Sequence, residues 1–179
     1  MQSPIYCDNR MLLSHPEVRT MIVETFVTMI SAYPDVQGIA WVATWAIAWW
    51  ALVAERMGLP FVYIRSKAKD HGRKNLVEWD IDQAERYVVI EDLISTWWSS
   101  LSAVQAMREV GKEIVSLGAI FSYGFSAADT AFELAWCKHF VLTDYLTLMQ
   151  EAAAGAYIET TDMVSLEKWR EDPQGWQNT

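Results

Sequence analysis

A regular alternation of apolar, β-rich segments with helical segments is the feature of this sequence that most constrains its fold. The β-rich segments are 38–44, 60–65, 87–91, 114–121 and 139–143, and the helical segments are 16–32, 46–57, 97–110, 127–135, 144–153 and 162–172. The β-rich segments are apolar along their length, which is typical of strands covered on both faces. The sequence therefore predicts an α/β fold, a parallel sheet flanked by helices, in a single domain over residues 1–179.

The charge balance limits the partners of such a domain. The chain has 14 basic and 23 acidic residues, which gives a formal net charge of −9. A chain this acidic is repelled by phosphate backbones and by anionic membrane surfaces. We therefore expect no nucleic-acid partner and no membrane partner, whereas small molecules and other proteins remain suitable.

The most apolar run, GIAWVATWAIAWWALVA at 38–54, contains no charged residue. Its length approaches that of a membrane span. We interpret it instead as a buried strand followed by a helix, because Gly38 opens it and Glu55 and Arg56 close it. Its β-rich start also gives way to alanine-rich sequence, as expected where a strand leads into a helix.

The cysteines and the first residues indicate the compartment. Cys7 and Cys137 are far apart and match no metal or redox spacing, so each is interpreted as a small core residue. Met1 is followed directly by polar, turn-like sequence, so we expect no signal peptide. Together these features predict a reducing, cytoplasmic location.

Ligands of doubly wound sheets bind beyond the carboxyl ends of the strands, and two such ends carry candidate chemistry. The first is followed by SKAKDHGRKN at 66–75, whose basic residues and histidine are Lys67, Lys69, His71, Arg73 and Lys74. One interpretation is a mobile lid that neutralises a leaving pyrophosphate, with Lys69 as charge clamp and His71 as hydrogen-bond donor or proton carrier. The other interpretation is a solvated surface turn.

The second strand end carries adjacent acids, Glu91 and Asp92. Two carboxylates at the end of a buried strand are costly unless something compensates them, so sugar hydroxyls or a magnesium ion are natural partners. Solvated acids that cap a turn are the alternative. Hydroxyl side chains follow at a predicted helix start, where an anion is favoured by the free N–H groups: Ser95, Thr96, Ser99 and Ser100. The combination suggests a site for a ribose phosphate.

With these motifs the chain resembles the orotate phosphoribosyltransferase family, a branch of the type I phosphoribosyltransferases, over nearly its whole length. The strand, acid, acid and hydroxyl-turn motif resembles the wider class, and the lid and the first segment resemble the orotate branch. The matching segments are SPIYCDNR (3–10), YIRSKAKDHG (63–72), VVIEDLIST (88–96), SSLSAVQAMREVG (99–111), AIFSYGF (119–125), LTDYLTL (142–148) and SLEKWREDPQGW (165–176).

The resemblance implies a phosphoribosyltransferase fold and a pentosyl transfer. Enzymes of this family move ribose 5-phosphate from phosphoribosyl pyrophosphate to orotate, giving orotidine 5′-phosphate and pyrophosphate, in pyrimidine biosynthesis. Mg²⁺ is the implied cofactor, carried by the substrate with Asp92 as a possible contact. A homodimer is implied as well, in which a lid loop at 65–79 reaches the site of the partner subunit.

The resemblance also implies roles for single residues. Lys69, His71 and Asp92 would be catalytic, and Ser95 and Tyr6 would bind orotate, with Arg10 in the same segment as Tyr6. The residues implied to bind phosphoribosyl pyrophosphate are Arg65, Lys69, His71, Glu91, Asp92, Leu93, Ile94, Ser95, Thr96, Trp97, Trp98 and Ser99.

The departures from the family are of one kind. Eight tryptophans stand mostly where the resemblance implies glycine or another small residue: Trp41, Trp45, Trp49, Trp50, Trp79, Trp97, Trp98 and Trp136. Glycine in a phosphate turn gives access to the backbone, and each indole adds a side chain of about 150–250 Å². Trp97 and Trp98 would then fill the phosphate site, which makes an inactive or engineered binding or regulatory module the alternative function.

Two other arrangements of the tryptophans remain open. The indoles of Trp97 and Trp98 could point outward, leaving the turn with its N–H groups. Ordinary core packing suits Trp41, Trp49 and Trp50 better than the pair in the turn. The resemblance further implies a helix and a lysine before residue 3, so we expect the N-terminal hood of the orotate site to be partly missing.

Overall fold

The computed structural model describes residues 3–42, 47–65, 77–78, 80–173 and 175. Its centre is a six-stranded sheet in the order β3-β2-β1-β4-β5-β6. The strands are β1 (Gly38–Val42), β2 (Phe61–Ile64), β3 (Val77–Glu78), β4 (Arg86–Ile94), β5 (Glu113–Ser122) and β6 (His139–Asp144). Five of them run parallel, and the edge strand β3 pairs antiparallel with β2. The predicted parallel sheet is confirmed, with β3 as an addition.

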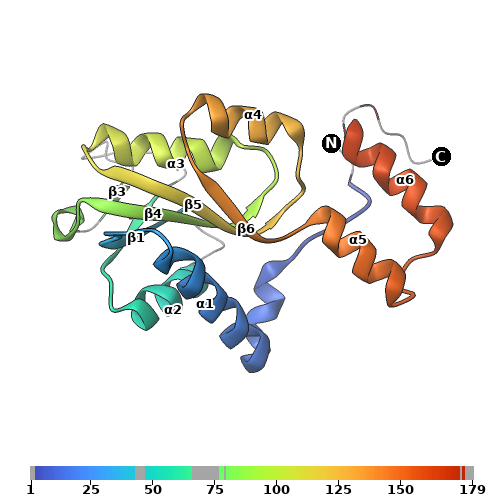
Figure 1. The fold of residues 1–179 in the computed structure, drawn as a ribbon, viewed down its shortest axis with the longest axis horizontal. Helices are drawn as coiled ribbons and strands as arrows, with labels where there is room; N and C mark the ends of the chain where they lie inside the picture. Colours follow the sequence, from blue (N-terminus) through green and yellow to red (C-terminus); the bar gives the residue numbers. More distant parts are fainter. Residues whose placement is uncertain (1–2, 43–46, 66–76, 79, 174, 176–179) are drawn as a thin grey trace.

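Helices cover both faces of the sheet (Figure 1). One face carries α1 (Pro16–Ser31) and α2 (Ile47–Met57), and the other carries α3 (Trp98–Glu109) and α4 (Ser126–Leu134). Beyond β6 lie α5 (Tyr145–Ala154) and α6 (Thr160–Glu171), beside the start of the chain. Short 3-10 helices occur at η1 (Asn9–Ser14) and η2 (Ile81–Gln83). Helices on both faces explain why the strands are apolar throughout.

The connections of β1 and β4 create the crevice in which a ligand can bind. These two strands are neighbours in the sheet. The chain leaves β1 through α2 on one face, and it leaves β4 through α3 on the opposite face (Figure 1). Strand order therefore reverses between β1 and β4, and the carboxyl ends at such a point diverge to leave a crevice.

Two hydrophobic clusters fill the space between the sheet and its helices. The cluster under α1 and α2 contains three fully buried tryptophans, Trp41, Trp49 and Trp50. Trp50 packs edge-on against Phe26, with ring centroids 5.1 Å apart. Core packing, the alternative expected for these three tryptophans, is confirmed. Their indole nitrogens have no hydrogen-bond partner within the described part of the chain.

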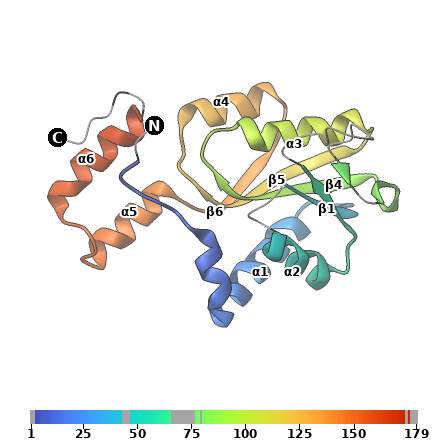
Figure 2. The same ribbon diagram turned by 180° about the vertical axis from the view of Figure 1, so that it is seen from behind.

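A third cluster joins the two ends of the chain. Tyr145 of α5 and Leu166 and Trp169 of α6 are buried together, and Ile5 and Cys7 of the N-terminal segment pack against them. Figure 2 shows this segment running from the α5 and α6 pair toward α1. The N-terminal segment is thereby held at the carboxyl end of the sheet.

Two predicted boundaries are wrong. The strand expected at 87–91 continues to Ile94, because its ladder with β5 extends to the pair Ile94 and Ser122. Asp92 therefore lies inside the strand and not directly after it, and Glu91 is not the last residue of the strand. Part of the lid loop expected at 65–79 is strand β3, and residues 66–76 and 79 lie outside the described residues.

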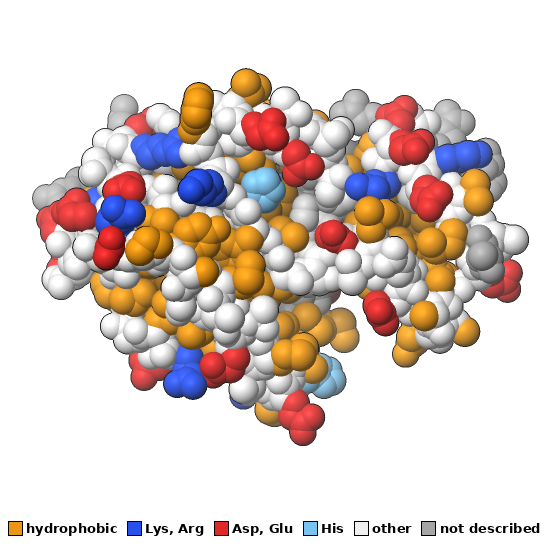
Figure 3. Space-filling view, in the orientation of Figure 1, with side chains coloured by type: hydrophobic (Ala, Val, Ile, Leu, Met, Phe, Trp, Pro, Cys, Tyr) orange, Lys and Arg blue, Asp and Glu red, His pale blue; other side chains and the backbone are white. Residues whose placement is uncertain are grey.

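Trp136 occupies a backbone position that favours glycine. It follows the end of α4 with φ of 51°, in the left-handed region. Its N–H donates to the carbonyl of Glu133, and the N–H of Cys137 donates to the carbonyl of Phe132, both at 3.0 Å. These two hydrogen bonds form a Schellman motif at the C-terminus of the helix, and the residue at the position of Trp136 in this motif is usually glycine. The indole is 90% exposed, and Figure 3 shows hydrophobic side chains standing out over α4.

Glycine at position 136 should stabilise the fold. A residue with a Cβ costs about 1 kcal/mol in this conformation, so Trp136→Gly should raise the free energy of unfolding by about that amount. Urea unfolding at constant slope would measure the gain. Trp136→Ala keeps the Cβ and removes the indole, so equal stabilities of the two variants would contradict the explanation.

Candidate active site

A cavity of about 530 Å³ opens at the carboxyl ends of β1 and β4. This is the crevice that the reversal of strand order creates. Its lining comes from four strand or helix ends and from the N-terminal segment. The lining residues are Tyr6, Cys7, Asp8, Asn9, Arg10, Val42, Ile64, Arg65, Glu91, Asp92, Leu93, Trp98, Ser99, Ser102 and Ala103.

Glu91 forms the buried floor of this cavity. It is 5% exposed, and its carboxylate accepts hydrogen bonds from Ser99 Oγ at 2.8 Å and from Ser100 Oγ. Both serines belong to the first turn of α3. Burial raises the pKa of Glu91 to about 7, the serine hydrogen bonds oppose the shift, and the charge of Asp92 adds to it. Glu91 thus ties strand β4 to the helix N-terminus beside the cavity.

Glutamine at position 91 should remove a pH dependence of stability. Because the folded state raises the pKa from 4.5 to about 7, the stabilisation from Glu91 is complete below pH 4.5 and is lost as the pH rises toward 7. The free energy of unfolding of the unchanged chain, relative to Glu91→Gln, should fall by about 3 kcal/mol over that window. Urea unfolding at a series of pH values would measure the difference.

Exposed Glu17 on α1 provides the matched control. Glu17→Gln should leave the pH profile of stability parallel to that of the unchanged chain. A free energy of unfolding of the unchanged chain that, relative to Glu91→Gln, stays constant or rises between pH 4.5 and 7 would contradict the assignment of a raised pKa.

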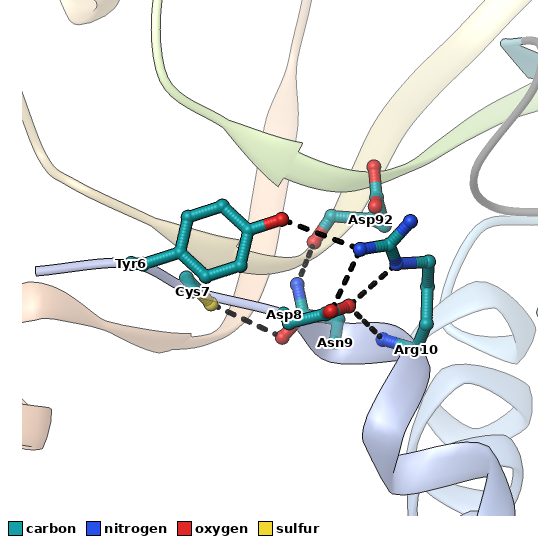
Figure 4. Close-up of polar contacts among 6 residues, drawn as sticks. All are labelled: Tyr6, Cys7, Asp8, Asn9, Arg10 and Asp92. Carbon is teal, nitrogen blue, oxygen red and sulfur yellow. Dashed lines mark hydrogen bonds and ion pairs between the residues drawn. The ribbon is translucent and has the colours of Figure 1, made fainter.

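Asp92 lies on the wall of the cavity next to the N-terminal segment (Figure 4). The side-chain amide of Asn9 donates to the backbone carbonyl of Asp92 at 2.8 Å and so anchors the segment on β4. Burial raises the pKa of the Asp92 carboxyl, whereas its own and the following backbone N–H and the charge of Arg10 lower it. The carboxylate is therefore next to a cation at the mouth of a partly desolvated site.

Arg10 is held by two neighbours on its own segment (Figure 4). Its Nε donates to Asp8 Oδ1 at 2.6 Å and its Nη2 donates to Asp8 Oδ2 at 2.7 Å. Nη2 also donates to the hydroxyl of Tyr6 at 3.3 Å. These bonds lower the pKa of Asp8 and raise that of Arg10, so both groups are charged at neutral pH. The planar guanidinium has a fixed orientation at the cavity.

The two tryptophans at the start of α3 diverge. Trp98 lines the cavity and is 67% exposed. Trp97 is half-buried against the core on the α3 side and borders a groove between α3 and α4. The rings meet edge-on with centroids 5.2 Å apart. Of the pair, Trp98 is the one beside the ribose-phosphate site inferred from the sequence.

The structure brings most of the expected site residues together. The cavity lining includes Tyr6, Arg65, Glu91, Asp92, Leu93, Trp98 and Ser99. Ile94 belongs to the core, Ser95 and Thr96 form the bend between β4 and α3, and Trp97 faces the groove. Lys69 and His71 lie outside the described residues.

The sequence reasoning did not assign roles to Asp8 and Asn9. The bond from Asn9 joins residues 83 positions apart, so no local pattern reports it. The polar run CDNR after an apolar start was the available signal.

Within the described residues, no group of three or more histidine, cysteine, aspartate or glutamate side chains is placed to hold a metal ion. Among the described helices, none is both long and apolar enough to cross a membrane.

The chain is similar to curated proteins over almost its full length. It is 47% identical to the orotate phosphoribosyltransferase of Porphyromonas gingivalis over 176 residues, which covers 98% of this chain and 84% of the relative. It is 45% identical to the orotate phosphoribosyltransferase of Cytophaga hutchinsonii, covering 97% and 84%. It is also 45% identical to that of Streptococcus agalactiae, covering 99% and 86%. No family model matches the chain.

Solved structures share the fold at lower sequence identity. An orotate phosphoribosyltransferase from Aeropyrum pernix superposes with a TM-score of 0.73 at 21% identity, covering 84% of this chain and 85% of that one. A UMP synthase from Leishmania donovani gives 0.77 at 20% identity, covering 93% and 37%. The sheet and its covering helices therefore match those of type I phosphoribosyltransferases.

Proposed function

The chain belongs to the orotate phosphoribosyltransferase family, and from that membership we propose how its cavity carries out the reaction. The reaction transfers ribose 5-phosphate from phosphoribosyl pyrophosphate to orotate, and it belongs to pyrimidine biosynthesis. The observation that carries the proposal is the cavity between β1 and β4, whose floor and wall are the adjacent acids Glu91 and Asp92. The alternative, a binding or regulatory module, is not favoured by identities of this extent.

The ribose lies against Glu91 and Asp92 in this proposal, because a sugar hydroxyl can donate to a carboxylate that is otherwise costly to bury. Asp92 accepts most of the hydrogen bonds from the ribose hydroxyls in this proposal, because the Glu91 carboxylate already accepts hydrogen bonds from Ser99 and Ser100. The 5′-phosphate lies at the N-terminus of α3, where unpaired N–H groups and the helix dipole favour an anion. That places the phosphate beside Trp98.

The pyrophosphate lies toward β2. Arg65 follows β2 on the cavity wall, and a guanidinium suits paired phosphate oxygens. Lys69 and His71 of the lid loop are proposed to neutralise the departing pyrophosphate and to donate a proton to it. The chain's contribution to catalysis is then the alignment of two anionic substrates and compensation for the leaving charge.

The cavity suits a magnesium ion carried by the substrate. Mg²⁺ binds through one or two carboxylates together with substrate phosphate oxygens, and Asp92 offers such a carboxylate. When bound, the ion would offset negative charge on the diphosphate.

Three further properties are proposed. A homodimer fits the lid of this family, which would reach the partner's site. Residues 1–179 act as one domain, supported by the packing of the N-terminal segment on α5 and α6. A cytoplasmic location fits the two free cysteines.

The test combines turnover with binding. Release of pyrophosphate from phosphoribosyl pyrophosphate that depends on orotate and Mg²⁺ would support the enzyme function. Phosphoribosyl pyrophosphate with Mg²⁺ at a hundredfold excess over Kd should also stabilise the fold by ~2.7 kcal/mol in thermal melts. Stabilisation without any pyrophosphate release would support the binding module. The absence of both stabilisation and pyrophosphate release would contradict the proposed function.

A further inference from the structure

We propose that α4 and the groove beside it form a contact between two copies of this chain, in which the α4 helices pack antiparallel about a two-fold axis near Thr130. The proposal goes beyond the transfer reaction, because this surface does not line the active-site cavity. Its basis is an exposed apolar ridge, formed by Leu134 and Trp136, that lies beside an uncharged groove.

The groove lies between α3 and α4, which run side by side on one face of the sheet (Figures 1 and 2). Its volume is about 710 Å³. Its α3 side includes Trp97 and Leu101, and its α4 side includes Ser126, Ala127 and Thr130. The described residues that line it are all uncharged, in a chain with a formal net charge of −9. Two such acidic chains can meet at this face without bringing like charges together.

The ridge is exposed and rigid. Leu134 is 77% exposed and Trp136 is 90% exposed, and hydrophobic side chains stand out over α4 in Figure 3. The guanidinium of Arg108 on α3 donates to the backbone carbonyls of Ala135 and Trp136, at 2.8 and 3.2 Å. The ridge is thereby fixed relative to the groove, so little freedom is lost when a partner covers both.

The order of side chains along α4 identifies the partner as a second copy. Ser126 and Ala127 in the first turn are exposed and small, whereas Leu134 at the other end is exposed and large. An antiparallel copy would place its own Leu134 over these small residues and receive the first copy's Leu134 in return. Such reciprocity defines a two-fold interface, in which one patch contacts itself. Because Thr130 is midway between Ser126 and Leu134, the axis passes near it.

Thr130 suits a position on this axis. Its hydroxyl donates to the backbone carbonyl of Ser126 at 3.0 Å, so burial would not leave it without a hydrogen-bond partner. The acids of α4 are on another flank of the helix. Asp129 meets His139 of the edge strand β6 at 3.6 Å, and Glu133 follows Asp129 by one helical turn. The side of α4 that faces the groove therefore consists of uncharged side chains.

The size of the surface predicts a weak dimer. Helices of 9 and 12 residues, each about 10 Å wide, present a face of about 300 Å². The exposed indole of Trp136 adds about 200 Å², so two copies would bury roughly 1,000 Å² in total. This total is near the lower limit for a specific contact between proteins. We therefore expect a dimer that dissociates on dilution.

This contact differs from the homodimer proposed above. That homodimer depends on the loop after β2, whereas α4 connects β5 to β6 on the other side of the sheet. Neighbouring strands are about 4.8 Å apart, which separates β2 from β5 by about 14 Å. A chain that used both contacts would form assemblies larger than a dimer.

The test places charge on the axis. In Thr130→Glu and in Thr130→Lys each copy would meet its own charge, so self-association should weaken by at least about 100-fold in both variants. An equimolar mixture of the two should restore association, because opposite charges then face each other across the axis. Sedimentation equilibrium over a range of concentrations would measure the dissociation constants. If the homodimer of the lid also forms, the same variants should reduce a tetramer to a dimer.

Two further variants complete the test. Val164→Glu puts the same charge on α6, where Val164 is 56% exposed, and should associate like the unchanged chain. Leu134→Ala removes a ridge side chain without adding charge and should weaken association by about tenfold. No dissociating assembly of the unchanged chain, association that both Thr130 variants retain, or a loss that their mixture does not restore would overturn the proposal. These measurements do not depend on turnover, so they are separate from the test of the proposed function.

Discussion

Asparagine at position 92 should lower kcat/KM for phosphoribosyl pyrophosphate by about 100-fold. Asp92 is the carboxylate on the cavity wall that the serines of α3 do not occupy. A hydrogen bond to a charged group contributes about 1.5–3 kcal/mol, and each 1.4 kcal/mol corresponds to a factor of ten. Asparagine keeps the size of the side chain and removes the charge, so the loss reports on ribose and magnesium contacts. Initial rates at varied phosphoribosyl pyrophosphate would measure it.

The stability of Asp92→Asn should hardly change, because the contact with Asn9 uses the backbone carbonyl of residue 92. Asp82→Asn offers a matched control, since Asp82 is exposed near Lys112 at the opposite end of β4. If kcat/KM of Asp92→Asn stays within about threefold of that of the unchanged chain, this carboxylate is not a substrate contact.

Glycine at position 98 should raise the affinity for phosphoribosyl pyrophosphate by about 10- to 100-fold. The indole of Trp98 lines the cavity at the first turn of α3, where the 5′-phosphate is proposed to lie. Glycine removes the ring and gives the phosphate access to backbone N–H groups. Each such charge-assisted bond is worth about 1.5–3 kcal/mol, which sets the range. Titration calorimetry with Mg²⁺ present would measure the dissociation constant.

The neighbouring residue provides the contrast. Trp97 faces the core and the groove along α4, so Trp97→Gly should lower stability without the gain in affinity. Trp136→Gly makes the same chemical change far from the cavity and should leave affinity unchanged. An affinity of Trp98→Gly equal to that of the unchanged chain would show that the indole does not obstruct the phosphate.

The architecture of the sheet was predictable because it depends on composition along single segments. Five apolar strands separated by helices allow few arrangements other than a parallel sheet with covered faces. Gly58 and Gly111, which follow helices, adopt the left-handed conformation that such glycines usually supply. These features are local, so one sequence contains enough information to place them.

The orientation of the tryptophans was not predictable in the same way. Trp97 and Trp98 are adjacent and chemically identical, yet one packs on the core and the other borders the cavity. Successive residues at the start of a helix point about 100° apart, so the direction of each ring depends on how α3 docks on the sheet. The predicted end of β4 was wrong for a related reason, because the length of this strand is set by its pairing with β5.

The contact between Asn9 and Asp92 also bears on the order in which the molecule is made. The segment that carries Tyr6 and Arg10 is made before the parts on which it rests, which are β4 and the pair α5 and α6, ending at Glu171. Contacts between such distant residues form late, after the intervening chain has closed its loops. The cavity wall that this segment forms would therefore be completed only after α6 has been made, and a nascent chain would hold its sheet before it holds that wall.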